Sequence, residues 1–261
     1  MRVLNIASTG MAAQQTNVEV ISNNIANMNT TGFKRARAEF QDLLYQSERR
    51  EGTLTSANGT VVPAGIDIGL GVKSAAVVRL NTQGGLNNTG NQLDMALDGK
   101  GFFVVNMPNG EQAYTRAGSF QLSAEGTIVT VDGYEVDPGV TVPENTRDIQ
   151  INNQGLVMAF VENEMEPVEI GQFTIATFVN ESGMKPIGDS LFRESVASGD
   201  PQIVNAGDPG VAIIRQGYVE SSNVNVVQEI TTLISAQRAY EMNSKVVETA
   251  DQMMTTANNI R

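Results

Sequence analysis

Hydrophobic residues recur on a seven-residue spacing at both ends of this chain, and both patterns predict helices that pack on other helices. The first face consists of Leu4, Ala7, Met11, Val18, Ile21, Ile25 and Met28. The second consists of Val226, Ile230, Leu233, Tyr240, Val247 and Met254. Steps of three and four residues are the period of a coiled-coil interface rather than of an ordinary surface helix. We therefore expect coiled-coil contacts between subunits or between the two ends of one chain, with packing on the chain's own domain as the simpler alternative.

The first pattern predicts a helix over residues 3–27. Gly10 lies inside it and costs about 1 kcal/mol relative to Ala, so this helix needs support from a neighbouring element. Asn and Thr residues, whose side chains compete for backbone hydrogen bonds, are frequent from residue 22 onwards. Because Gly32 can adopt the left-handed conformation that ends a helix, we expect the end between Met28 and Gly32.

The second pattern predicts one helix over residues 224–260, which contain no Gly or Pro. Ser221, Ser222 or Asn223 can cap its start. At 1.5 Å per residue it would be about 55 Å long. A small domain cannot cover a helix of that length, so we expect a partner helix along much of it.

The segments between the first helix and the centre of the chain are less regular. Residues 33–46 are apolar at Phe33, Phe40 and Leu43, which fits either a short helix or an extended strap. Residues 47–72 are polar, Gly-rich and uneven, which predicts a long loop or arm. Connections of that length in a compact domain are usually functional or interfacial.

From residue 72 to about 217, short runs rich in Val, Ile, Phe and Thr alternate with Gly, Asn, Asp and Pro. Asn109-Gly110, Glu125-Gly126 and Asp132-Gly133 are typical of hairpin turns. Short strands at close spacing predict an all-β sandwich or open barrel. Residues 140–142 form one of the short runs that we interpret as a strand.

The fold class expected from these patterns is α+β. Discontinuous N- and C-terminal helices, residues 1–32 and 218–261, form a coiled-coil domain. Residues 33–75 form a connecting segment and a long extended arm. Residues 76–217 form a central all-β domain.

The composition lowers the expectation of an enzyme. The chain has no His and no Cys, so the commonest general base, the thiolate nucleophile and the usual zinc ligands are missing. We expect no catalytic, cofactor-binding or metal site and no cofactor.

The net charge of −12 is concentrated in the middle of the chain. Residues 1–50 carry six bases and four acids, and residues 218–261 carry three bases and five acids. The acidic middle argues against a nucleic-acid partner. No apolar run is long enough to span a bilayer, and polar residues interrupt the N-terminus, so we expect export without a cleaved signal peptide.

Other local patterns favour structural explanations. Asp94 and Asp98 resemble a carboxylate pair, but solvated loop acids are the simpler interpretation. Gly199 to Gly210 carries Asp200, Asn205 and Asp208 without the terminal Glu of a calcium loop, which favours two turns. Gly99-Lys100-Gly101 lacks the strand–loop–helix context of a phosphate-binding loop and is expected to be a turn.

Lys34, Arg35 and Arg37 form a small basic cluster beside the end of the first helix. A phosphate contact is one interpretation of this cluster. A solvated face or a salt bridge to a neighbouring subunit is the interpretation that we favour.

Two terminal motifs are similar to those of one known family. They comprise Asn23, Asn24, Asn27, Gly32, Phe33 and Lys34 near the start, and Gln237, Arg238, Tyr240 and Asn243 near the end. Together they resemble the rod and hook signatures of the bacterial flagellar axial proteins. Residues 93–103 and 114–120 are similar to the start of the family's outer β domain. Residues 12–17, 40–46 and the arm at 46–72 favour its distal-rod branch, and the chain is too short for the additional outer domain of a hook protein.

The resemblance implies a structural subunit that assembles with itself into a rigid helical tube. Such a tube transmits motor torque to the hook and encloses the export channel, within a rod that crosses the periplasm. The implied partners are further copies of the chain, proximal rod proteins, hook protein, the surrounding basal-body rings and the type III export apparatus. Alternatives are a hook protein of the same family or a secreted β-sandwich adhesin whose helices form a stalk.

Overall fold

The computed structural model describes residues 2–49, 51, 64–162 and 166–259. The chain forms two compact units that are interleaved in sequence. The first, here the helical unit, comprises residues 1–25, 36–78 and 225–261. The second, here the β unit, comprises residues 26–35 and 79–224. The domain limits expected from the sequence, at residues 32, 75 and 217, stay a prediction.

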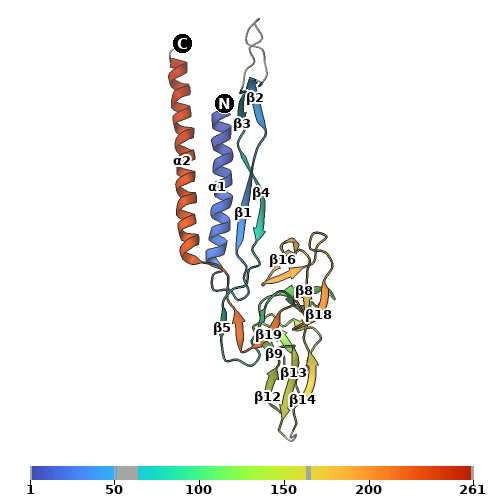
Figure 1. Cartoon of the computed structure of the whole chain (residues 1–261). Helices are drawn as coiled ribbons and strands as arrows, with labels where there is room; N and C mark the ends of the chain where they lie inside the picture. The colour runs from blue at the N-terminus through green and yellow to red at the C-terminus, as the bar shows by residue number, and fades with distance from the viewer. Residues whose placement is uncertain (1, 50, 52–63, 163–165, 260–261) are drawn as a thin grey trace. The chain divides into compact units, whose positions relative to one another are not determined.

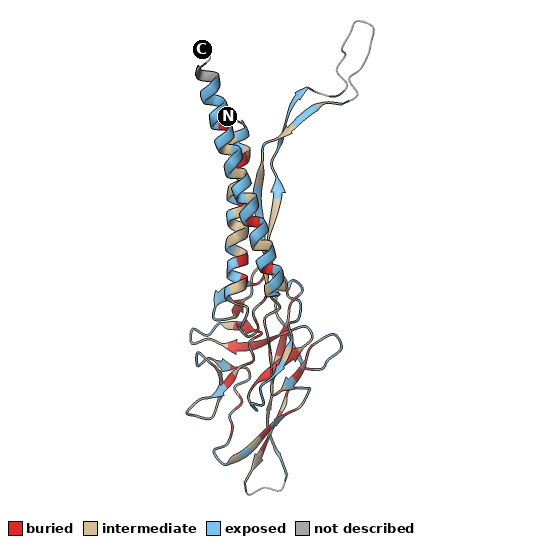
Figure 2. Cartoon of the chain, turned by 90° about the vertical axis from the view of Figure 1, so that its left-hand side faces the viewer, coloured by how far each residue is buried: buried red, intermediate tan, exposed pale blue. Residues whose placement is uncertain are grey.

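Two long antiparallel helices lie side by side in the helical unit (Figures 1 and 2). They are α1 (Arg2–Ala26) and α2 (Val226–Asn259). A Cβ atom on Gly10 of α1 would lie 2.9 Å from Nδ2 of Asn243 on α2, so the missing side chain lets the helices approach closely. This contact is the support that a glycine inside α1 requires.

The C-terminal end of α1 and the N-terminal end of α2 both differ from the prediction. Helix α1 ends at Ala26, before the expected Met28–Gly32 range, because the chain turns where the Thr30 amide donates to the Asn27 carbonyl at 3.2 Å. Helix α2 is capped by Asn225 rather than by residues 221–223. The Asn225 side-chain oxygen accepts a hydrogen bond from the Gln228 amide at 3.2 Å.

The segment after α1 is an extended ribbon, not a second helix. Strand β1 (Ala36–Asp42) pairs with β4 (Val72–Arg79), and β2 (Tyr45–Arg49) pairs with β3 (Ile66–Gly69). Backbone hydrogen bonds at residues 43–44 and 70–71 connect the two pairs. The described part of the expected arm is therefore paired strand rather than loop, whereas residues 50 and 52–63 lie outside the described residues.

The ribbon is attached to α1 through Thr9. The Val72 amide donates to the Thr9 hydroxyl at 3.3 Å, and that hydroxyl donates to the Ile6 carbonyl at 2.8 Å. Gly71 adopts a φ of +127°, and a Cβ atom there would lie 2.2 Å from Oγ1 of Thr9. This position therefore requires glycine for two reasons, its backbone conformation and its close approach to α1.

The β unit is built from short strands. They are β5 (Leu86–Asn88), β6 (Met95–Asp98), β7 (Phe102–Asn106), β8 (Gln112–Thr115), β9 (Phe120–Leu122), β10 (Ile128–Thr130), β11 (Glu135–Val136), β12 (Thr146–Ile151), β13 (Leu156–Val161), β14 (Val168–Gln172), β15 (Thr174–Thr177), β16 (Lys185–Gly188), β17 (Leu191–Arg193), β18 (Gln202–Asn205), β19 (Ile213–Gln216) and β20 (Tyr218–Glu220). A 3-10 turn, η1, spans Glu181–Gly183. The described residues thus form an α+β fold, with terminal helices and a β-rich centre.

One sheet dominates this unit. Among the described strands, nine form a sheet in the order β16-β17-β8-β7-β11-β10-β9, with β15 also on β7 and β18 on β15. A separate sheet contains β12, β13 and β14, and two-stranded pairs join β19 with β6 and β20 with β5. The expected hairpin turns are confirmed, since Gly110, Gly126 and Gly133 each have a positive φ between paired strands.

Residues 140–142 do not form the expected strand. Val140 and Val142 are buried, so the apolar pattern is real, but this stretch is a loop that packs on the sheet. Its isolated bridge joins Thr141 to Thr127. Side-chain burial and strand pairing are separate requirements, and the sequence pattern reports only the first.

The core of the β unit surrounds β7. Phe103 is fully buried and packs edge-on against Phe120, with ring centroids 5.2 Å apart. On the opposite face of the strand, Phe102 lies 6.0 Å from Phe178 in a similar edge arrangement. These aromatic contacts place β7 between two layers of packed side chains.

Replacing Phe103 by Ala is expected to lower the free energy of unfolding of the β unit by about 3–5 kcal/mol, because it leaves a cavity in this core. Urea denaturation followed by circular dichroism measures the change. Val131 is 67% exposed, so the control Val131→Ala should change the same quantity by less than about 0.5 kcal/mol. Similar losses for both variants would contradict the assignment of the core.

Candidate functional site

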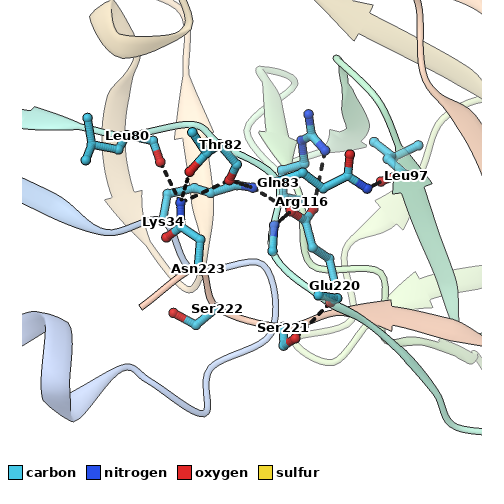
Figure 3. A network of polar contacts seen from close by, with 12 residues as sticks. Lys34, Leu80, Thr82, Gln83, Leu97, Arg116, Glu220, Ser221, Ser222 and Asn223 are labelled. Atoms are coloured by element: carbon cyan, nitrogen blue, oxygen red, sulfur yellow. Dashed lines mark hydrogen bonds and ion pairs between the residues drawn. The ribbon is translucent and has the colours of Figure 1, made fainter. Parts of the chain in front are cut away.

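A buried ionic network joins three distant segments of the β unit (Figure 3). Nζ of Lys34 lies 2.5 Å from Oε1 of Glu220, and Nη1 of Arg116 lies 3.3 Å from Oε2 of the same carboxylate. The side chains of Lys34, Arg116 and Glu220 are only 2%, 3% and 0% exposed, respectively. Removing one partner of such a pair leaves an uncompensated charge in the interior, which is strongly destabilising. The network therefore holds these three segments together.

Backbone groups complete this network. Lys34 donates to the Thr82 carbonyl at 3.0 Å, and the Gly84 amide donates to Oε1 of Glu220 at 2.8 Å. Arg116 donates to the Gly99 carbonyl at 2.7 Å and lies over the Phe102 ring. The Glu220 carboxylate therefore accepts hydrogen bonds from three separate segments, as a buried anion requires.

Gly32 brings Lys34 into this network. Its φ is +69°, and a Cβ atom there would lie 2.7 Å from the backbone of both Arg116 and Ala117. Its amide donates to the Glu220 carbonyl at 2.8 Å. A residue that we interpreted as a helix terminator is thus required for close packing of two backbones.

The structure corrects the interpretation of the basic cluster. Lys34 is an internal ion-pair residue rather than part of a solvated face or a contact with a neighbouring subunit. Burial lowers the pKa of Lys34 from its usual value, and the charge of Glu220 opposes that shift. Arg37 is exposed and pairs with Glu39 at 2.8 Å.

Asn223, which we expected as a possible helix cap, instead connects two irregular backbone segments beside the network. Its Nδ2 donates to the Leu80 carbonyl at 2.8 Å and to the Thr82 carbonyl at 3.0 Å. Its Oδ1 accepts from the Arg35 amide at 2.7 Å. The side-chain amide therefore bridges two backbone segments of the β unit.

A second polar contact, here the Asn24 clasp, lies in the helical unit. Nδ2 of Asn24 donates to the Ala36 carbonyl at 2.8 Å and to Oε2 of Glu229 at 3.1 Å. Its Oδ1 accepts from the Ala36 amide at 2.9 Å. Asn24 and Glu229 are both almost fully buried. The clasp joins α1, the start of β1 and α2 through one side chain.

Glu229 was missed by the sequence analysis, although a signal exists. It begins the seven-residue series Glu229, Ala236, Asn243 and Ala250, which faces α1. These residues are small or polar, so a search for large apolar side chains passes over them.

The predicted interface residues fall into two groups. Those at least partly buried within the helical unit are Leu4, Met11, Val18, Ile21, Ile25, Val226, Leu233 and Val247. The exposed ones are Ile230, Tyr240 and Met254. Contacts with α1 therefore account for only one side of the apolar surface of α2. Whether the remaining surface meets other subunits stays a prediction.

The terminal motif residues also divide. Asn24, Gly32 and Lys34 are buried, whereas Asn23, Gln237 and Arg238 are exposed and Asn27, Phe33 and Asn243 are partly buried. A groove of about 660 Å³ lies between the helices. It is lined by Gln15, Val18, Glu19, Gln237, Tyr240 and Glu241.

The acidic residues considered for chemistry have structural contacts. Asp94 is buried and accepts hydrogen bonds from the Thr89 hydroxyl at 2.6 Å and from the side-chain Nδ2 of Asn91 at 3.1 Å, so it is not a solvated loop acid. Asp98 pairs with Arg215 at 2.7 Å. Gly99 and Gly101 have positive φ values in the turn between β6 and β7.

The described residues contain neither a side-chain cluster typical of a metal site nor a helix suited to span a membrane. Within residues 2–49, 51, 64–162 and 166–259, no three His, Cys, Asp or Glu side chains gather as a metal site would require. In that same part of the chain, neither helix has the length and apolar character needed to cross a bilayer.

Three family models match separate parts of the chain. The model described as "Flagella basal body rod protein" matches residues 4–34. The model "Flagellar hook protein FlgE/F/G D1 domain" matches residues 96–159. The model "Flagellar basal body rod FlgEFG protein C-terminal" matches residues 215–260. The first and third cover the terminal helices, and the second lies in the β unit.

Curated relatives match over almost the whole length. The flagellar basal-body rod protein FlgG of Caulobacter vibrioides is 52% identical over 261 residues, which is 100% of both chains. The protein of the same name from Agrobacterium fabrum is 54% identical over 253 residues, 97% of each chain. A crystal structure of the Helicobacter pylori flagellar hook protein FlgE2 aligns with a TM-score of 0.24 and 15% identity, over 63% of this chain and 47% of that one.

Replacing Glu220 by Gln is expected to lower the free energy of unfolding by about 3–5 kcal/mol, because Lys34 and Arg116 would stay buried without their anion. Urea denaturation of the full chain measures this change. The control is Glu111→Gln, which removes an exposed pair with Arg193 and should cost less than about 1 kcal/mol. Equal losses of unfolding free energy in the two variants would show that the buried Glu220 network contributes no more to stability than an exposed ion pair.

Replacing Asn24 by Ala is expected to destabilise the helical unit by about 1–3 kcal/mol, because buried backbone groups of Ala36 lose their partner. Hydrogen exchange followed by mass spectrometry should show faster exchange at the Ala36 amide. Ser22 is exposed on the same helix, so Ser22→Ala serves as control. Unchanged exchange in the Asn24 variant would disprove the role of the clasp.

Proposed function

Since this chain belongs to the flagellar basal-body rod protein family, we propose that it assembles with copies of itself into the distal rod, a rigid helical tube. Membership in the family makes it a structural subunit of the flagellum and not an enzyme. The tube would transmit motor torque to the hook and enclose the export channel. The observation that carries the proposal is 52–54% identity to rod proteins over nearly full length.

The exposed apolar surface of the helical unit supports self-assembly. Ile230, Tyr240 and Met254 are each at least 40% exposed although they follow a helix-packing period. Burial of apolar surface contributes roughly 25 cal/mol per Å². A helix that leaves large apolar side chains in water gains stability when further copies cover them.

In the proposed tube, residues 1–32 and 218–261 form an inner coiled-coil layer around the channel. Residues 33–75 brace neighbouring subunits as connecting segment and arm, and residues 76–217 form the outer β domain. The eleven apolar positions expected from the sequence, with Leu4 as the first and Met254 as the last, would contribute to subunit contacts. A contact between unlike surfaces that does not close produces a helical filament.

Assembly within the basal body also defines the proposed partners and location. The rod would cross the periplasm, with proximal rod proteins at one end and hook protein at the other. The basal-body rings would surround it, and the type III export apparatus would deliver its subunits. The acidic centre of the chain suits a solvent-facing surface rather than a nucleic-acid partner.

Both alternative functions are weaker. The relatives that match over nearly the full length are rod proteins rather than hook proteins. The adhesin interpretation has no support, because the matching family models and relatives are rod and hook proteins.

The purified full chain is expected to form open-ended straight tubes, visible by electron microscopy. Replacing Leu233 by Asp should prevent polymerisation and leave the thermal unfolding of the β unit unchanged, because a charge would enter the predicted helix interface. The control is Val227→Asp on the same helix, where the native side chain is 76% exposed. Discrete oligomers of the unmodified chain, or tubes from the Leu233 variant at normal yield, would contradict the proposal.

A further inference from the structure

Helix α2 carries a second heptad series that the sequence analysis did not recognise. It lies one residue before the series that faces α1, and successive helical residues are rotated by about 100°. Its steps alternate between four and three residues, as in a coiled-coil interface. We call it the lateral seam, and it consists of Ser235, Ala239, Met242, Val246, Thr249 and Met253.

The lateral seam is largely uncovered. Met242 and Met253 are 64% and 63% exposed, and Val246 is 43% exposed. Ala239 at its centre is partly buried. Large apolar side chains therefore lie in line along one face of α2, outside its contact with α1.

The hydroxyl groups on this seam are already satisfied. Ser235 donates to the Thr231 carbonyl at 3.0 Å, and Thr249 donates to the Lys245 carbonyl. A hydroxyl bonded to the preceding turn leaves its aliphatic part facing outward. The seam can therefore be buried against another surface without leaving an unpaired donor, which is the usual cost of covering Ser or Thr.

Cationic residues flank the lateral seam. Arg238 and Lys245 are seven residues apart, so they project from the same side of α2, and both are exposed. Within the described part of the chain neither has an ion-pair partner. They place positive charge beside the apolar seam.

The groove between the helices has complementary properties. Its apolar lining comes from Val18 and Tyr240, and its two carboxylates are Glu19 and Glu241. Both carboxylates are exposed, and neither forms an ion pair in the described residues. Helical rotation places Tyr240 on the other flank of the α1-facing series from the lateral seam. Glu241 lies on the side of α2 away from α1, three residues from Arg238 and four from Lys245.

We propose that the lateral seam of one copy docks into the helix groove of a second copy, with Arg238 and Lys245 facing Glu19 and Glu241. The charges and apolar surfaces of the two sites match, and the apolar seam and Tyr240 of the groove lie on opposite flanks of the α1-facing series of α2. Because the contact joins unlike surfaces, it leaves one free seam and one free groove and can repeat without closing. This inference rests on the proposed self-assembly and specifies which surfaces meet.

Charge reversal tests the pairing in the full chain. One variant carries Arg238→Glu and Lys245→Glu, a second carries Glu19→Lys and Glu241→Lys, and a third carries all four changes. Each double variant should raise the critical concentration for polymerisation at least about tenfold, because like charges would face each other. The fourfold variant should return to within about threefold of the unmodified chain, since both sites are reversed together.

A matched control separates pairing from net charge. Lys100→Glu with Lys185→Glu makes the same charge change as the first double variant, at exposed residues of the β unit, and should polymerise normally. Normal polymerisation by either double variant overturns the docking and leaves self-assembly intact. Failure of the unmodified chain to form any open polymer overturns the proposed function itself, and this inference with it.

Cross-linking gives an independent measurement, which covers the case in which the fourfold variant does not fold. The chain has no Cys, so Met242→Cys with Val18→Cys introduces the two thiols alone. Mild oxidation of the polymer should yield a ladder of disulfide-linked oligomers. Val227→Cys with Val18→Cys is the control and should yield no ladder. Absence of a ladder from the first pair in intact polymer overturns the docking.

Discussion

The buried ion pairs of the Glu220 carboxylate hold distant segments of the β unit together. This carboxylate pairs with Lys34, 186 residues away in sequence, and with Arg116, 104 residues away. An unpaired charge in the interior is costly, so these segments cannot separate without a large loss of free energy. The close packing around this network also requires Gly32, because there is no room for a side chain where its backbone meets that of Arg116.

In the helical unit, the buried side chain of Asn24 likewise connects segments that are distant in sequence. This side chain bonds to Ala36 and to Glu229, which is 205 residues away. Polar groups of this kind add directional contacts that apolar packing lacks. The surface of α2 that faces α1 is accordingly small and polar at Glu229, Ala236 and Asn243, whereas larger apolar side chains remain outside.

Several features could be predicted because they depend on local patterns. The seven-residue spacing indicated both helices, and the Gly-containing turns located three hairpins. Predictions failed where a local signal has more than one tertiary use. Asn223 can cap a helix, yet here it bridges Leu80 and Thr82. Lys34 belongs to a basic cluster in sequence, yet it is buried against an anion that no local pattern connects with it.

The terminal helices, the β-rich centre and the family resemblance could all be predicted from the amino-acid order, because periodicity, turn residues and motifs each depend on residues that are close in sequence. The side of α2 that meets α1 could not be predicted in this way and follows from packing in the folded chain, because apolar positions occur on more than one face of this helix. Only the folded chain brings Glu220 to Lys34 and Glu229 to Asn24. Those pairings depend on the free energy of burying charged and polar groups together, which arises only when distant segments fold into contact.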